Sequence, residues 1–237
     1  MPSFQRGRGD DDHQIPTSAY ELVEHLRRHA TDDERVLDAI AHTPRERFVA
    51  AHLEPYAYED TALPTEAGQT ISQPTIVAMM TAALELAGDE RVLDVGTGSA
   101  YQAAILSRLS EYVVTVEVVD SLRLAAEERL QSLGIQNVTV LPAGEELGAP
   151  HLGPYDAILV AAAAPAVPPS LLEQLAPGGR LVVPVGTRAE QELVRVTRGA
   201  NADRATFEED QLGACRFVPL VGPEGFSDED DPEDTPR

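Results

Sequence analysis

The stretch VLDVGTGSAY at residues 92–101 decides the fold of this chain. A short β-branched run leads into Gly96-Thr97-Gly98, and a helix-forming run follows at once. Glycine lets the backbone turn this tightly and approach a ligand this closely. In open α/β sheets, ligands bind at the carboxyl ends of the strands, where such a turn lies. The stretch therefore predicts a ligand site, although a tightly packed turn would carry the same letters.

Short apolar runs of the same character recur along the chain. Five of them alternate with helical or turn-like segments, which predicts a parallel sheet with right-handed crossovers. Two later runs lack a long helix between them, so we expect an antiparallel hairpin at one sheet edge. Seven strands of this kind predict a doubly wound α/β domain with helices on both faces. The expected strands are 91–95, 112–117, 137–141, 156–161, 180–185, 192–198 and 214–220, and the helices between them are 99–110, 121–133 and 167–176.

The N-terminal part of the chain predicts helices. Apolar residues recur at helical spacing over 18–30, and Thr31 with Glu34 matches a capping box before a second helix. Residues 45–71 show no clear period, and we expect loops with a short strand there. An apolar helix is predicted over 74–86, with a proline in its first turn.

These patterns imply one folded domain with two extensions. We expect a disordered arm over residues 1–16 and a folded domain over 17–222, whose first helices form a cap. Six of the seven residues at 228–234 are acidic, so a disordered acidic tail is expected over 223–237.

The composition excludes several classes of protein. The net charge is -22 and all 18 basic residues are arginine, so the surface repels nucleic acid phosphates. The acidity fits a high-salt cytoplasm, whereas arginine without lysine also fits a GC-rich genome. No stretch reaches the roughly 18 apolar residues of a membrane span. The N-terminus lacks a signal-like apolar region, and Cys215 is the only cysteine. We therefore expect a cytoplasmic protein with neither membrane nor nucleic acid partners.

An acidic residue follows the glycine turn at the spacing that is typical of nucleotide-binding sites. Glu117 ends the second strand, nineteen residues after Gly98, where a carboxylate can accept two hydrogen bonds from a ribose diol. In so acidic a chain it could also be an ordinary exposed acid. The sixth position of GTGSAY is Tyr101 rather than glycine, which disfavours a dinucleotide, and the absence of lysine excludes a Walker-type phosphate site. A ligand with ribose but no phosphate, such as S-adenosyl-L-methionine, fits better.

At this point the chain resembles the protein-L-isoaspartate O-methyltransferases over roughly residues 20–222. The resemblance implies a class I SAM-dependent methyltransferase fold, which is Rossmann-like with a mostly parallel seven-stranded sheet. It also implies methyl transfer from S-adenosyl-L-methionine to the free carboxylate of L-isoaspartyl residues in damaged proteins and peptides. The ester then closes to a succinimide, whose hydrolysis returns part of the population to aspartate. The motifs that carry the resemblance are RERFV (45–49), AYED-ALP (57–64), GQTISQP (68–74), VLDVGTGSAYQAA (92–104), PYDAILVAAAAPAVP (154–168), LAPGGRLVVPVG (175–186) and RFVPL (216–220).

The resemblance also implies which residues form the site. The family's key serine corresponds to Ser72, although a helix N-cap is the alternative interpretation of a serine there. Thr70 and Gln73 are expected beside it, with Thr70 on the same face of an extended segment as Ser72. Arg216 and Val218 are expected on a substrate-binding strand that would otherwise be an ordinary edge strand. The expected cofactor residues are Asp94, Gly96, Thr97, Gly98, Ser99, Glu117 and Glu145.

The chemistry implied here asks for no metal and no general base. A carboxylate with a pKa of about 4 is already ionised at neutral pH, so the protein must mainly hold and aim it. His25 and His29 lie one helical turn apart, but without a third ligand we take them as surface residues.

Two positions depart from the family pattern. Where the family carries an adenine-binding aspartate, this chain has Gly144, so either Glu145 serves after a one-residue shift or backbone groups hold adenine. Glu66 also places an acid near the expected substrate entrance. The alternatives are therefore a specialised relative that methylates an aspartate of one dedicated peptide and a nucleotide-binding homologue without catalysis, with a dehydrogenase as a distant third. We expect a monomer.

Overall fold

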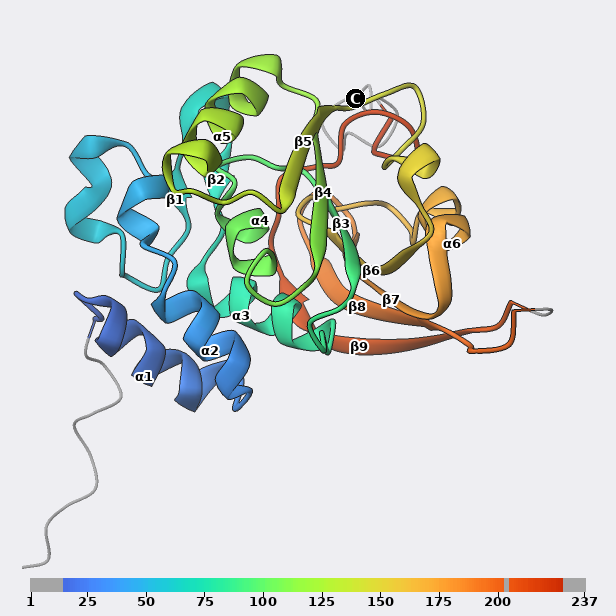
Figure 1. The fold of residues 1–237 in the computed structure, drawn as a ribbon, viewed down its shortest axis with the longest axis horizontal. Helices are drawn as coiled ribbons and strands as arrows, with labels where there is room; N and C mark the ends of the chain where they lie inside the picture. The colour runs from blue at the N-terminus through green and yellow to red at the C-terminus, as the bar shows by residue number, and fades with distance from the viewer. Residues whose placement is uncertain (1–14, 203–204, 228–237) are drawn as a thin grey trace, which may run out of the picture.

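The computed structural model describes residues 15–202 and 205–227 (Figure 1). Residues 1–14 of the expected arm and 228–237 of the expected tail lie outside the described residues. Within the described part of the chain, no helix is both long enough and apolar enough to cross a bilayer.

A seven-stranded sheet organises the domain, in the order β5-β4-β3-β6-β7-β8-β9. Its first five members in space run parallel, and β8 and β9 add an antiparallel edge, as the sequence predicted. The chain enters this sheet at β3, continues on one side through β4 and β5, and then crosses to the other side of β3 to form β6. This reversal creates the crevice in which open α/β sheets bind ligands. The strands are β3 (Arg91–Val95), β4 (Tyr112–Glu117), β5 (Val138–Pro142), β6 (Tyr155–Val160), β7 (Leu175–Gly186), β8 (Gln191–Arg198) and β9 (Phe207–Cys215).

Helices cover both faces of the sheet, but unequally. Val92 and Val113 face a core that also contains side chains of the first five helices, whereas Leu93 and Val114 face a second core with the last helix. This alternation follows from the two-residue period of a strand. Figure 1 shows α1 and α2 as a cap on the outer side of α3, away from the sheet. The helices are α1 (Ala19–His29), α2 (Glu34–Ala41), α3 (Pro74–Ala83), α4 (Tyr101–Leu106), α5 (Asp120–Ser132) and α6 (Pro169–Gln174).

Short elements connect the cap to the sheet. A two-stranded ribbon pairs β1 (Leu63–Pro64) with β2 (Thr70–Ile71), which accounts for the short strand expected in this region. Single 3-10 turns occupy Arg45–Phe48, Ala51–Tyr56, Glu66–Gly68 and Pro150–Leu152.

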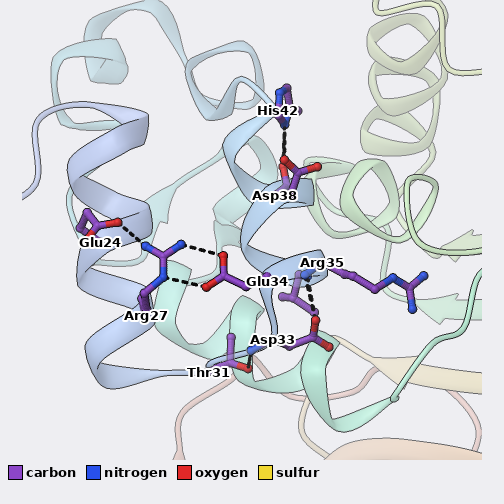
Figure 2. A network of polar contacts seen from close by, with 9 residues as sticks. Glu24, Arg27, Thr31, Asp33, Glu34, Arg35, Asp38 and His42 are labelled. Carbon is purple, nitrogen blue, oxygen red and sulfur yellow. Dashed lines mark hydrogen bonds and ion pairs between the residues drawn. The ribbon is translucent and has the colours of Figure 1, made fainter.

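Polar contacts join α1 to α2 (Figure 2). Arg27 donates to both carboxylate oxygens of Glu34 at 2.9 and 2.8 Å and also contacts Glu24. The predicted capping box is wrong: the N-cap of α2 is Asp33, which accepts from two amides of the first turn. Thr31 instead accepts from the Asp33 amide at 3.1 Å, because the helix begins two residues later than the capping pattern requires.

The last predicted strand is also misplaced. We expected 214–220, but β9 spans Phe207–Cys215. An edge strand exposed on one side needs few apolar residues, so the acidic run Glu208–Asp210 gives no strand signal. The last three residues of the expected strand, 218–220, line a cavity instead.

Candidate active site

One cavity joins the two segments singled out by the sequence. It has a volume of about 1020 Å³, including the open space at its mouth, and it lies at the carboxyl ends of β3 and β4. Ser72, Gly96 and Glu117 all line it, although they come from three separate parts of the chain. Its remaining walls come from Ala143–Gly148 and from the segment that ends at Pro223.

The glycine turn forms the floor of this cavity. Gly96 and Gly98 have φ angles of 97° and 51°, a region that favours glycine. The Gly96 and Thr97 amides both donate to the Val116 carbonyl, at 3.0 and 3.1 Å, which fixes the turn against β4. Ala100 takes the place of a third glycine and adopts the same unusual region with a φ of 68°. Backbone strain is therefore concentrated beside the cavity.

Glu117 faces the turn with a carboxylate that is already oriented. One of its oxygens accepts from the Gly98 amide at 2.8 Å and the other from the Val119 amide at 2.9 Å. The side chain is only 7% exposed and lines the cavity. Each carboxylate oxygen retains a second lone pair, so Glu117 can accept two more hydrogen bonds from a ligand.

Asp94 does not line the cavity, contrary to its predicted cofactor contact. It is fully buried beneath the turn, where it accepts from the Thr115 hydroxyl at 2.9 Å. That hydroxyl also lies 2.7 Å from the Thr97 hydroxyl, so a chain of polar contacts links Asp94 to the turn. Burial raises the pKa of Asp94 to about 7. Asp94 thus supports the turn from below rather than touching a ligand.

Ser72 lines the same cavity with a free hydroxyl. Thr70 and Ser72 both line the cavity while Ile71 between them is buried, as the alternation of an extended segment predicts. Among the described residues, the Ser72 hydroxyl has no hydrogen-bond partner. The alternative that Ser72 caps α3 is wrong, since the N-cap position is Gln73.

Asp60 holds the main chain of this wall. Its carboxylate accepts from the Thr75 amide at 2.8 Å, which caps α3, and from Gln73 Nε2 at 3.0 Å. His25 Nε2 lies 3.1 Å from the same carboxylate, so α1 is tied to the wall. Burial alone would raise the pKa of Asp60, but these hydrogen bonds hold it below its usual value. Gln73 therefore acts inside the scaffold and does not line the cavity.

No metal site is present among the described residues. His25 stacks on His29 with ring centroids 4.4 Å apart, and no group of three or more potential ligands forms in this part of the chain.

The segment after β9 forms the far wall. It lies beside Ala163, whose amide donates to the Val218 carbonyl at 2.8 Å and whose carbonyl accepts from Leu220 at 2.7 Å. Val218 lines the cavity as predicted, but Arg216 is exposed and does not. On one side this segment is thus paired within the fold by an isolated parallel bridge, and its contact with a peptide substrate stays a prediction.

The end of the cavity expected to hold adenine also differs from the prediction. Gly144 and Glu146 line it, whereas Glu145 lines a neighbouring hollow with Glu173 and Glu224. The side chain of Glu66 lies outside the described residues. Glu145 therefore does not line the cavity, and how adenine is held stays a prediction.

Two site residues were not predicted from the sequence. Tyr101 was taken only as an obstacle to a dinucleotide, but its buried ring lines the cavity. Arg45 lies behind that ring, with its guanidinium carbon 4.7 Å from the ring centroid. The only sequence signal for Arg45 is its place in the RERFV motif, which by itself assigns no contact.

Comparisons with known proteins agree on one family. A family profile described as protein-L-isoaspartate(D-aspartate) O-methyltransferase matches residues 17–225. Protein-L-isoaspartate O-methyltransferase 2 of Pelobacter propionicus is 50% identical over 206 residues, which cover 86% of this chain and 90% of that protein. The Roseiflexus castenholzii protein-L-isoaspartate O-methyltransferase is 48% identical over 212 residues, covering 90% and 95%.

Solved structures give the same result. A protein-L-isoaspartate O-methyltransferase superposes with a TM-score of 0.75 at 27% identity, covering 87% of this chain and 67% of that one. A Plasmodium falciparum structure assigned to the same enzymes, with S-adenosyl-L-homocysteine bound, superposes with a TM-score of 0.74 at 26% identity and covers 86% and 98%.

Proposed function

The chain belongs to the protein-L-isoaspartate O-methyltransferase family, and we propose that it transfers a methyl group from S-adenosyl-L-methionine to the free carboxylate of L-isoaspartyl residues in damaged proteins and peptides. The single observation that carries the proposal is the shared cavity: it is lined both by Ser72, with its free hydroxyl, and by the ribose-type carboxylate of Glu117. The ester product would then close to a succinimide and so begin repair.

The cavity suits a ligand with a ribose and a positive charge. Glu117 presents oriented lone pairs for a diol, and the described lining residues include no arginine or histidine to bind phosphate. When bound, S-adenosyl-L-methionine supplies a methyl group on a sulfonium, which is electrophilic without any metal. Glu117, Gly96, Thr97, Gly98 and Ser99 would hold it, with the glycine turn below and Glu117 at the side.

The protein's own contribution to the reaction is positioning. The isoaspartyl carboxylate is ionised at neutral pH and needs no base. One of its oxygens forms the new bond to the methyl carbon while the carbon–sulfur bond breaks and its electron pair stays on sulfur. The Ser72 hydroxyl can donate to the other oxygen, and Thr70 lies on the same wall. Holding the carboxylate in line in this way lowers the entropic part of the barrier.

Methyl transfer from labelled S-adenosyl-L-methionine to an isoaspartyl peptide and its aspartyl twin tests the proposal. We expect label on the isoaspartyl peptide alone, and a loss of about 10- to 100-fold in kcat/KM for Ser72→Ala with folding unchanged. Ser132→Ala removes an exposed hydroxyl from α5 and is the matched control. Wild-type enzyme that labels no isoaspartyl peptide would refute repair; label on one aspartyl peptide instead would favour the specialised relative.

We further propose that the protein works as a monomer in the cytoplasm, without nucleic acid or membrane partners. The net charge of -22 supports the exclusion of nucleic acid. Light scattering after size exclusion tests the oligomeric state, and a mass near 25.5 kDa is expected.

A further inference from the structure

Arg45 is a buried cation with few partners. Its side chain is 0% exposed, and both Nε and Nη1 are buried without a hydrogen-bond partner. Only Nη2 is engaged, donating to the Ser72 carbonyl at 2.8 Å and more weakly to the Thr61 carbonyl at 3.5 Å. Burial lowers the pKa of Arg45 from its usual value, but an arginine keeps its charge at neutral pH. Burying a charge without hydrogen-bond partners lowers the stability of the fold, which indicates that Arg45 has a function other than stabilisation.

The cation lies directly behind the cavity wall. Two of the residues that it contacts, Ser72 and Tyr101, line the cavity. They come from the substrate wall and from the first residue of the helix after the glycine turn. The guanidinium therefore contacts the wall of the cavity from inside the protein, where a charge is screened less than in water.

The described residues that line the cavity carry no positive charge that could attract an anion. Glu117 and Glu146 both line the cavity, and its described lining contains no cationic side chain. Asp60 is the acid that acts electrostatically on Arg45, yet its oxygens accept from Thr75, Gln73 and His25 rather than from Arg45. Arg45 makes no ion pair with a described carboxylate. An anionic substrate entering this cavity therefore meets two acids and one buried cation.

We propose that Arg45 is a specificity-determining residue whose unpaired buried charge makes the cavity prefer a carboxylate over a neutral group of the same shape. The inference rests on the proposed function and adds a residue that acts through the wall without touching substrate. The methyl ester formed is neutral, so the same charge that favours binding of the substrate gives no advantage to the product. Arg45 thereby helps discriminate damaged chains from those already methylated.

The test compares two peptides that differ only in this charge. One carries the isoaspartyl carboxylate and the other the corresponding amide, isoasparagine, and calorimetry measures the binding of each to enzyme saturated with S-adenosyl-L-homocysteine. This cofactor product has no sulfonium charge, so the contribution of Arg45 is isolated. The readout is the ratio of the two dissociation constants, which a loss of wall shape would leave unchanged because both peptides would weaken together.

Arg45→Gln retains an N–H donor but removes the charge, whereas Arg45→Lys retains the charge. For Arg45→Gln we expect the preference for the carboxylate to fall about tenfold, as two unit charges about 12 Å apart at an effective dielectric constant of about 20 predict. Arg45→Lys should keep most of the preference. Val196→Ala, a fully buried change in β8, controls for lost stability. An Arg45→Gln enzyme with the wild-type preference would overturn the proposal.

Asp60→Asn provides a second test if Arg45→Gln does not fold. It removes the acid that partly offsets Arg45, so we expect the preference for the carboxylate to rise by about two- to threefold even if both affinities fall. An unchanged or smaller ratio would count against the inference. If the wild-type enzyme methylates the isoaspartyl peptide but the ratio of the two dissociation constants is the same in the wild type and the variants, the inference alone is refuted. If the wild-type enzyme methylates nothing, the proposed function is refuted as well.

Discussion

Replacing Glu117 by glutamine should remove most of the affinity for the cofactor. In the folded protein, the two Glu117 oxygens accept from the Gly98 and Val119 amides at 2.8 and 2.9 Å. Glutamine keeps one of these oxygens and places an NH₂ group against the other N–H, which cannot bond to it. The ribose diol likewise loses one charge-assisted hydrogen bond and retains only a neutral one.

The magnitude follows from these losses. A hydrogen bond to a charged group is worth about 1.5–3 kcal/mol, and a neutral one about half of that. Losing one and weakening another should cost about 2–4 kcal/mol, or roughly 30- to 1,000-fold in the dissociation constant of S-adenosyl-L-homocysteine.

Calorimetry with S-adenosyl-L-homocysteine measures this loss directly. Glu111→Gln alters an exposed acid just before β4 and is the matched control, with affinity within about twofold of the wild type. Thermal unfolding establishes that the variant is folded. If a folded Glu117→Gln protein bound the ligand as tightly as wild type, the assignment of Glu117 to the ribose would be wrong.

Three further changes test the scaffold. Burial raises the pKa of Asp94 to about 7, so the folded protein holds this proton more tightly than the unfolded chain. The stability contributed by this group is thus complete below about pH 4 and is lost as the pH rises to 7, by up to about 4 kcal/mol. Asp94→Asn should therefore flatten the dependence of the unfolding free energy on pH over this range. Urea unfolding of both proteins at several pH values measures this, and parallel profiles would contradict the prediction. Ala100→Gly should relieve the strain of a positive φ and stabilise the fold by about 0.5 kcal/mol, because about 1 kcal/mol of strain exceeds the entropic cost of glycine; a lower urea midpoint would show otherwise. Asp33→Ala should cost about 1 kcal/mol as the loss of the α2 cap, and Thr31→Ala clearly less; equal losses in denaturant melts would restore the capping-box interpretation.

The parts of the fold that depend on local periodicity were predictable. The β-branched runs from Arg91 to Gly186 alternate with helical segments, and the parallel order of the sheet follows from that alternation. The edge at β9 was not predictable, because an exposed strand such as Phe207–Cys215 carries no apolar pattern. Conversely, the apolar residues 218–220 resembled the end of a strand, although they form part of the cavity wall.

The candidate site divides in the same way. The glycine turn followed by Glu117 is a local pattern that predicted a ligand site, whereas the resemblance to the family singled out Ser72; both segments line the cavity. The sequence could not determine which side chains would be withdrawn from the cavity. Asp94 is buried under the turn and Gln73 is bonded to Asp60, because contacts between distant segments decide the direction of a side chain.

Arg45 marks the limit of what the sequence determined. Its neighbours Tyr101 and Ser72 lie 56 and 27 positions away in the chain, and no spacing rule relates such distances to contact. The amino-acid order determined the sheet, the glycine turn and the chemistry available at its edge, since these depend on neighbours along the chain. Only the packing of the Arg45–Phe48 turn against Ser72 and Tyr101 placed an unpaired cation behind the wall, since burial and electrostatic fields depend on distances through space.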